Sequence, residues 1–196
     1  MKLFHSAHAC SQAPYILTQE LGLACDIVKT NFSDRTELLK YNTRGQVPTL
    51  VLDDGRVLAE GAVIMQYLAD QKPEANLLAR QGTWERYKTL EAMNYVASEL
   101  HKSIGALFAK DAPPEYIAFQ KEIVGRRLET LNTFFGQNQF MACNQYTIAD
   151  IYCYVIVGWT RVLGIDMSRF GNILGYVERI GARPAVVRVT QADAAR

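Results

Sequence analysis

The sequence predicts an α+β protein with a βαβ-ββα half at residues 1–75 and an all-helical half at residues 83–196. Three observations support this fold class. Short apolar runs alternate with helical patterns up to residue 70, and Asp-Asp-Gly at residues 53–55 forms a tight turn between two such runs. No strand-turn-strand pattern follows the polar, proline-containing stretch at residues 71–82, which we interpret as a linker.

The first half contains four expected strands and three expected helices, in the order strand, helix, strand, helix, strand, strand, helix. The strands are expected at residues 2–5, 25–28, 49–52 and 56–58, and the helices at residues 10–21, 33–41 and 62–70. Gly22 ends the first helix, and Pro14 falls within its first turn, where a missing N–H does least harm. A βαβ unit followed by a hairpin predicts a mixed sheet with helices on its faces.

The second half reads as helices throughout. They are expected at residues 84–110, 115–136, 146–157, 170–180 and 185–194. Thr147 and Asp150 have the spacing of a capping box at the start of the third helix, and its loss should cost about 1 kcal/mol. The run that follows is apolar all round, which predicts a buried helix.

Composition argues against several classes of partner and site. The net charge is +1, so there is no electrostatic case for nucleic acid or an anionic membrane as a partner. No apolar run approaches the length of a membrane span, and no signal peptide is expected. The four cysteines (Cys10, Cys25, Cys143 and Cys153) lack CxxC or metal-like spacing. We therefore expect reduced thiols, a cytoplasmic protein and no metal site.

Cys10 is the first candidate for chemistry, because it lies where a loop enters a helix. Free N–H groups and the helix dipole favour an anion there, so a thiolate would be stabilised and nucleophilic. The alternative is a small buried residue at a helix start. Ser11 is either a second hydrogen-bond donor to a bound thiolate or a simple helix cap. No second cysteine follows within three residues, which disfavours a dithiol exchanger and leaves a monothiol route open.

Five short motifs then occur in order across both halves. They are Ala9-Cys10-Ser11, Gly45-Gln46-Val47-Pro48, Glu60-Gly61 ahead of Ile64-Met65-Gln66-Tyr67-Leu68, Glu99-Leu100-His101-Lys102, and Thr147-Ile148-Ala149-Asp150. With these motifs the chain resembles the cytosolic glutathione transferases, most closely the bacterial beta class that carries a cysteine at the first helix. The resemblance implies a thioredoxin-like first half, glutathione as co-substrate and a homodimer.

The resemblance also implies which residues contact glutathione. Ala9 and Cys10 would both be glutathione-binding residues, and Cys10 would lie beside the sulfur, either hydrogen-bonding it or forming a mixed disulfide. Val47-Pro48 would have a cis peptide bond, so that the Val47 backbone pairs with the cysteinyl part of glutathione like an added strand. An ordinary proline at a strand entry is the alternative.

The γ-glutamyl and glycyl ends of glutathione are assigned to other positions by the resemblance. N–H groups at the helix opened by Glu60 and Gly61 would hold the γ-glutamyl carboxylate, the alternative being a generic helix start. Gly61 has no hydroxyl, so this contact should involve the backbone alone. Arg35 would pair with the glycyl carboxylate, and a solvated surface charge is the competing interpretation.

Asn94, Ser98 and His101 are separated by four and three residues, which places them on one helical face. In similar proteins this face meets the glutathione site, with some groups coming from across the dimer, and His101 would hydrogen-bond near the sulfur or near the γ-glutamyl end. A solvent-facing stripe is the alternative. Phe108 and Trp159 are candidates for the electrophile pocket, with ordinary helix packing as the competing interpretation.

The function expected from the resemblance is conjugation of the glutathione thiolate to small apolar electrophiles, a detoxification reaction. Cys10, Ser11 and His101 would then be the catalytic residues. Two alternatives remain open at the level of sequence. One is a glutathione-dependent thiol reductase or peroxidase that uses Cys10, and the other is a non-catalytic glutathione-binding stress protein.

Overall fold

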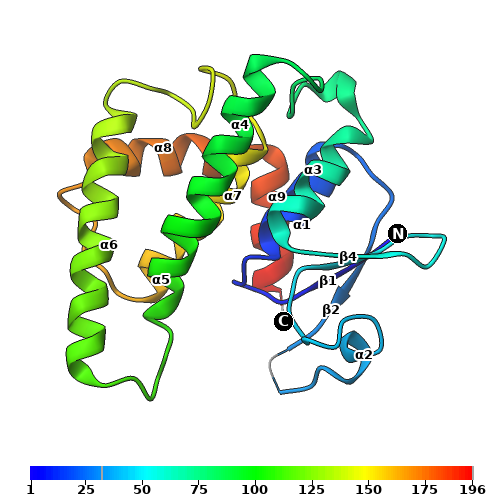
Figure 1. The fold of residues 1–196 in the computed structure, drawn as a ribbon, viewed down its shortest axis with the longest axis horizontal. Coiled ribbons are helices and arrows are strands. Elements are labelled where there is room, and N and C mark those ends of the chain that lie inside the picture. Colours follow the sequence, from blue (N-terminus) through cyan, green and yellow to red (C-terminus); the bar gives the residue numbers. More distant parts are fainter. Residues whose placement is uncertain (32, 196) are drawn as a thin grey trace. The chain divides into compact units, whose positions relative to one another are not determined.

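A computed structural model of the protein describes residues 1–31 and 33–195. The chain forms two compact units (Figure 1): one comprises Met1–Leu78 together with the C-terminal segment from Arg183, and the other comprises Ala79–Ala182. This grouping differs from the division expected from sequence, because the last helix belongs to the first unit. Arg196, at the end of the expected helical domain, lies outside the described residues.

The first unit is built on a mixed four-stranded sheet, as the sequence predicts. Its strands are β1 (Lys2–His5), β2 (Asp26–Lys29), β3 (Thr49–Val51) and β4 (Val57–Ala59). Their order is β2-β1-β3-β4, with β1 parallel to β2 and the other two pairings antiparallel. Leu3 of the central strand β1 pairs with Ile27 on one side and with Leu50 on the other.

The helices of the first unit are α1 (Gln12–Glu20), α2 (Thr36–Leu39), α3 (Gly61–Asp70) and α9 (Pro184–Ala194). Phe4 packs with Leu38 of α2 and Val51 of β3 on one side of the sheet. Because side chains alternate along a strand, Leu3 and His5 point to the opposite face, where α1 contacts both β1 and α9 (Figure 1). Leu3 and His5 are both fully buried.

The second unit contains only helices among its named elements. They are α4 (Trp84–Tyr95), a π-helical segment (Val96–His101), α5 (Lys102–Ala106), α6 (Pro114–Phe135), α7 (Ile148–Val162) and α8 (Gly171–Gly181). The long helix expected from residue 84 is present as a continuous run to Ala106, but with the π-helical segment inside it. A π-turn is wider than an α-turn, so side-chain spacings of three and four residues no longer define a common face there.

The capping box at α7 is confirmed. Thr147 accepts hydrogen bonds from the first turn, and the Asp150 side chain accepts from the Thr147 backbone N–H at 2.9 Å. Asp150 also accepts from the Met141 N–H at 2.8 Å and the Tyr176 hydroxyl at 3.3 Å, and it is fully buried. Burial raises the pKa of Asp150 to about 6, because desolvation outweighs the hydrogen bonds that favour the carboxylate.

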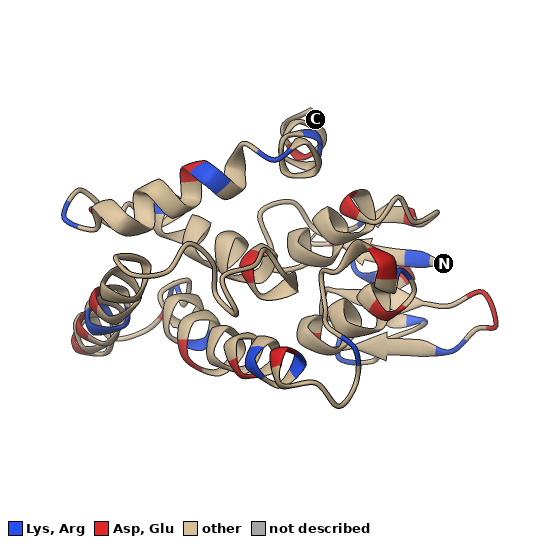
Figure 2. Cartoon of the chain, turned by 90° about the horizontal axis from the view of Figure 1, so that it is seen from above, with Lys and Arg blue, Asp and Glu red and all other residues tan. Residues whose placement is uncertain are grey.

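Charged residues are distributed without segregation by sign. Figure 2 shows acidic and basic residues interspersed along the chain, in keeping with the net charge of +1. Among the described residues, none of the helices combines the length and apolarity that crossing a membrane requires.

Candidate functional site

Cys10 lies in the turn immediately before α1, two residues ahead of the first helical residue. The Gln12 N–H donates to the Ala9 carbonyl at 3.0 Å, and the Ala13 N–H donates to the Cys10 carbonyl at 3.1 Å, so this turn is fixed to the helix that follows. The half-buried thiol of Cys10 donates to the Val47 carbonyl at 3.4 Å. Two segments that are distant in the sequence therefore meet at this sulfur.

The expected stabilised thiolate at Cys10 is wrong, although the backbone N–H groups at the helix start do favour the charged form. Burial raises the pKa of the Cys10 thiol to about 11, since desolvation outweighs the favourable backbone N–H groups of Cys10 and Ser11. The negative charge of Glu60 raises it further. With its pKa raised in this way, Cys10 is a neutral thiol at physiological pH, and it acts as a hydrogen-bond donor.

Ser11 is turned into the protein interior and does not cap the helix with its side chain. Its fully buried hydroxyl accepts from the Ser6 N–H at 3.1 Å and lies 3.3 Å from the Ser6 carbonyl. The His5 ring nitrogen Nδ1 is 3.0 Å from the same oxygen. The interpretation of Ser11 as a simple helix cap is therefore wrong.

Val47-Pro48 and Glu60-Gly61 lie close together beside Cys10. The Val47-Pro48 peptide bond is cis, as the resemblance implies. Glu60 has a φ of 69°, a left-handed backbone conformation that is uncommon for a residue other than glycine. A Cβ built on Gly61 would lie 3.5 Å from Pro48 Cγ, an ordinary contact, so the start of α3 directly faces the proline corner.

The start of α3 is suited to holding a carboxylate. The Glu60 carbonyl accepts the first intrahelical bonds, from Val63 and Ile64 at 3.0 Å each. The N–H groups of Gly61 and Ala62 precede these and have no intrahelical acceptor, as in any α-helix. Together with the positive end of the helix dipole, they form a site for an anionic group.

Two arginines lie near these segments. The half-buried Arg35 donates through Nη1 to the Gly45 carbonyl at 2.9 Å. This contact holds Arg35 against the loop before Val47. Arg44 pairs with Glu60 at 3.1 Å, and both of these side chains are exposed.

In the helical unit, His101 belongs to an aromatic cluster against α7. Its Nδ1 lies 2.6 Å from the Tyr152 hydroxyl, and its ring packs edge-on against Trp159 with centroids 4.9 Å apart. Phe108 also packs edge-on against Trp159, with ring centroids 5.5 Å apart. Trp159 is buried, whereas Phe108 is 42% exposed, so Phe108 presents an apolar surface next to the cluster.

Asn94 and Ser98 do not share the environment of His101. Both are exposed, and the Ser98 hydroxyl donates back to the Asn94 carbonyl at 2.9 Å. His101 instead turns toward α7. The π-helical segment that contains Ser98 and His101 accounts for this separation, because the expected common face assumed an unbroken α-helix.

Sequence reasoning missed three residues that organise these surroundings: His5, Tyr152 and Asp193. His5 Nε2 lies 2.9 Å from Asp193 Oδ1, and both side chains are buried. One signal for His5 was present in the sequence, since the alternation of β1 places it on the same face as Leu3. Within residues 1–31 and 33–195, no three His, Cys, Asp or Glu side chains are grouped so that they could hold a metal ion.

Comparisons with known proteins give matches in both halves of the chain. The family model for the glutathione S-transferase N-terminal domain matches residues 9–71, and the model for the C-terminal domain matches residues 95–184. The glutathione S-transferase GstA of Escherichia coli O157:H7 is 35% identical over 198 residues, covering 98% of both chains.

Two solved structures are also similar over the full length. A sphingomonad glutathione S-transferase in complex with glutathione is 36% identical, with a TM-score of 0.97 and complete coverage of both chains. A bacterial beta class enzyme from Sphingomonas chungbukensis is 38% identical, with a TM-score of 0.95 and 98% coverage of both chains.

Proposed function

Because the chain belongs to the glutathione S-transferase family, we propose that it conjugates the sulfur of glutathione to small apolar electrophiles. One observation carries this proposal. The Cys10 thiol, the Val47 backbone and the anion-holding start of α3 meet within the first unit. A tripeptide with a central thiol and a carboxylate at each end matches such a set of groups.

Each part of glutathione has a proposed contact in the first unit. Val47 and Pro48 pair with the cysteinyl backbone, and the N–H groups at Glu60-Gly61 hold the γ-glutamyl carboxylate. Cys10 borders the sulfur, and Ala9, which precedes it in the same turn, is a further proposed contact of glutathione. Arg35, which lies against the Gly45 carbonyl, is the proposed partner of the glycyl carboxylate.

The proposed chemistry uses Cys10 as a donor. Glutathione loses its thiol proton to solvent, and the resulting thiolate accepts a hydrogen bond from Cys10 Sγ–H, which lowers the pKa of the bound thiol. The thiolate attacks an electrophilic carbon, a C–S bond forms, and the leaving group departs with its electron pair. The raised pKa of Cys10 supports this role, because a neutral thiol donates whereas a thiolate cannot. The burial of Ser11 favours Cys10 over Ser11 for this contact.

The helical unit supplies the proposed pocket for the electrophile. Phe108 and Trp159 provide apolar surface, and His101 is held in a defined orientation by Tyr152, which suits a group that hydrogen-bonds near the sulfur. Asn94 and Ser98 are exposed, so we assign them a contact with glutathione only as part of a homodimer.

A homodimer in the cytoplasm is the proposed state of the protein. Two large aromatic side chains on α4 are exposed, Trp84 to 70% and Tyr87 to 58%, and such apolar surface supports a protein–protein interface on this helix. The four cysteines are free, which fits a reducing compartment. Light scattering coupled to size exclusion measures the mass directly, and a mass of one chain at micromolar concentration would contradict the dimer.

The function is tested with 1-chloro-2,4-dinitrobenzene and glutathione as substrates for the purified protein and two variants. We expect turnover by the wild type, kcat/KM lowered about 10-fold in Cys10→Ala, and a loss of less than about 3-fold in Cys10→Ser, which keeps a donor. A thiol reductase behaves differently, because both variants would abolish reduction of a glutathione mixed disulfide. Absence of wild-type turnover with this electrophile and with disulfide and peroxide substrates would refute transferase activity.

A further inference from the structure

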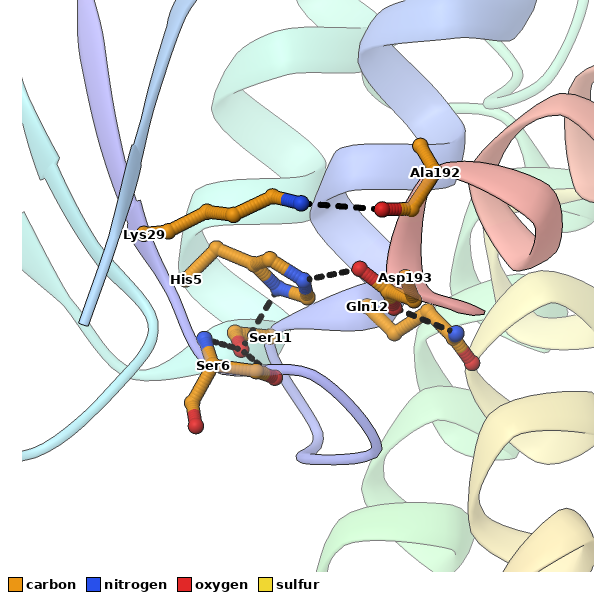
Figure 3. A network of polar contacts seen from close by, with 7 residues as sticks. All are labelled: His5, Ser6, Ser11, Gln12, Lys29, Ala192 and Asp193. Carbon is orange, nitrogen blue, oxygen red and sulfur yellow. Dashed lines mark hydrogen bonds and ion pairs between the residues drawn. The ribbon is translucent and has the colours of Figure 1, made fainter. Parts of the chain in front are cut away.

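His5, Ser11 and Asp193 form a buried chain of polar contacts in the first unit (Figure 3). His5 ends β1, and its imidazole lies between the Ser11 hydroxyl at 3.0 Å and the Asp193 carboxylate at 2.9 Å. The second oxygen of Asp193 accepts from Gln12 Nε2 at 2.8 Å. One carboxylate on α9 therefore holds side chains from both β1 and α1.

These residue types are those of a hydrolytic triad, but the geometry does not support hydrolysis. His5 and Ser11 are fully buried, and the Ser11 hydroxyl already contacts both polar groups of the Ser6 backbone. The imidazole is also reversed: Asp193 meets Nε2 and Ser11 meets Nδ1, whereas in serine hydrolases the carboxylate meets Nδ1. A substrate has no access to such a hydroxyl, so the chain of contacts has a different role.

The proton positions in this chain are determined by Asp193. Burial raises its pKa, but hydrogen bonds from His5 and Gln12 and the positive charge of His5 and His8 outweigh burial, so that the pKa is lowered overall. The carboxylate is charged and has no proton to give, and His5 Nε2 therefore carries the hydrogen between them. Whether Nδ1 accepts from Ser11 or donates to it, the Ser11 oxygen is held in the same place.

Ser11 in turn closes the loop that carries Cys10. Its hydroxyl joins the end of the loop to the Ser6 backbone, and inside the loop the Ala9 N–H donates to the Ser6 carbonyl at 3.1 Å. Cys10 is the residue next to Ser11. Any displacement of Ser11 therefore moves the Cys10 sulfur relative to its acceptor on Val47.

We propose that Asp193 and His5 are positioning residues that fix the Cys10 thiol through Ser11. The C-terminal helix thereby contributes to the site without touching the substrate. The inference rests on the proposed function in one respect, namely that Cys10 faces the sulfur of glutathione.

Other contacts hold α9 in place, so Asp193 can be tested without removing the helix. Lys29 Nζ donates to the Ala192 carbonyl at 2.8 Å near one end, and Arg183 forms a double contact with Glu20 at 2.7 and 3.2 Å at the other. Glu20→Gln is the matched control, because it weakens an anchor of α9 and leaves the loop untouched.

The test compares Asp193→Ala, Asp193→Asn and Glu20→Gln by two measurements made well below the melting temperature. The first is the alkylation rate of each cysteine by iodoacetamide, quantified by peptide mass spectrometry. We expect Asp193→Ala to raise the Cys10 rate about 10-fold with Cys25 and Cys143 unchanged, and Asp193→Asn, which keeps an acceptor for His5, to raise it less. The second is kcat/KM for glutathione, expected to fall about 10-fold in Asp193→Ala and to stay at the wild-type value in Glu20→Gln.

The two measurements separate this proposal from the proposed function. A folded Asp193→Ala protein whose Cys10 rate and kcat/KM stay within about twofold of wild type would overturn the positioning role. If Asp193→Ala does not fold, the same criterion applies to Asp193→Asn. A wild type without transferase activity refutes the function alone, because alkylation of Cys10 still decides whether Asp193 positions it. A purely structural role would change the alkylation of all the cysteines alike.

Discussion

Asp193 in the first unit and Asp150 in the second are both buried carboxylates, yet their surroundings shift the pKa in opposite directions. Asp193 accepts from side chains of two other elements, one of which is an imidazole. Asp150 accepts mostly from the backbone and hydroxyl groups around its own helix start. Burial raises the pKa of either group, but the hydrogen bonds and electrostatic attraction from the side chains around Asp193, His5 first among them, reverse the balance for Asp193 alone. A buried carboxylate thus stays charged readily when an imidazole pairs with it, and less readily among neutral donors.

The largest expected effect is the loss of stability in Asp150→Ala. Removing this carboxylate leaves the Met141 and Thr147 N–H groups buried without acceptors and breaks the contact to Tyr176. We expect the free energy of unfolding to fall by about 4 kcal/mol, well above the value for a helix cap alone. Urea denaturation measures it. Asp166→Ala, an exposed aspartate that accepts from the Ser168 N–H, is the control and should cost less than about 1 kcal/mol.

The second expected effect is a pH dependence that comes from Asp150. Its pKa is raised from 3.8 to about 6, so the folded state binds the proton more tightly, and its contribution to stability is complete below about pH 4 and lost as the pH rises through 6. The stability of the wild type relative to Asp150→Asn should therefore decrease by about 3 kcal/mol between about pH 4 and 7. Urea denaturation across this range tests the sign. An increase with pH would show that the hydrogen bonds outweigh burial.

Asp193 should produce the opposite and smaller pH dependence. Because its pKa is lowered in the folded state, its contribution is present above the unfolded value of 3.8 and lost as the pH falls through the folded value. The stability of the wild type relative to Asp193→Asn should thus decrease on acidification from about pH 5 to 3. If stability changed with pH in the same direction for both aspartates, their surroundings would not shift the two pKa values in opposite directions.

The two aspartates also differ in how far apart in the sequence their partners lie, and this decides which contacts could be predicted. Thr147 and Asp150 are three residues apart, so their capping box was predicted from local spacing and is present. His5 and Asp193 are 188 residues apart, and no periodicity or motif links them. Backbone features such as the mixed sheet and the buried α7 follow from hydrophobic patterns, which are also local.

For the candidate site, the resemblance predicted which residues contact glutathione, but the environments of Cys10 and His101 differ from those expected from sequence. The pKa of Cys10 depends on how deeply the loop is buried and on Glu60, neither of which local sequence specifies. The environment of His101 depends on the π-helical segment, whose residues follow the same apolar pattern as an α-helix. Asn94, Ser98 and His101 were therefore placed on a common face that the wider turn does not provide.

The smallest expected effect is that of Tyr152→Phe, which removes a polar contact where neither partner is a carboxylate. The Tyr152 hydroxyl is 2.6 Å from His101 Nδ1, and the edge-on packing of His101 against Trp159 remains in the variant. We expect the free energy of unfolding to fall by about 1 kcal/mol, because the hydrogen bond to His101 is lost while the edge-on packing of the rings stays. Tyr87→Phe, whose hydroxyl is on a 58% exposed residue, is the control and should be neutral. A loss as large as that of Asp150→Ala would contradict this ranking. It would show that the contact between Tyr152 and His101 stabilises the fold as much as the buried carboxylate of Asp150 does.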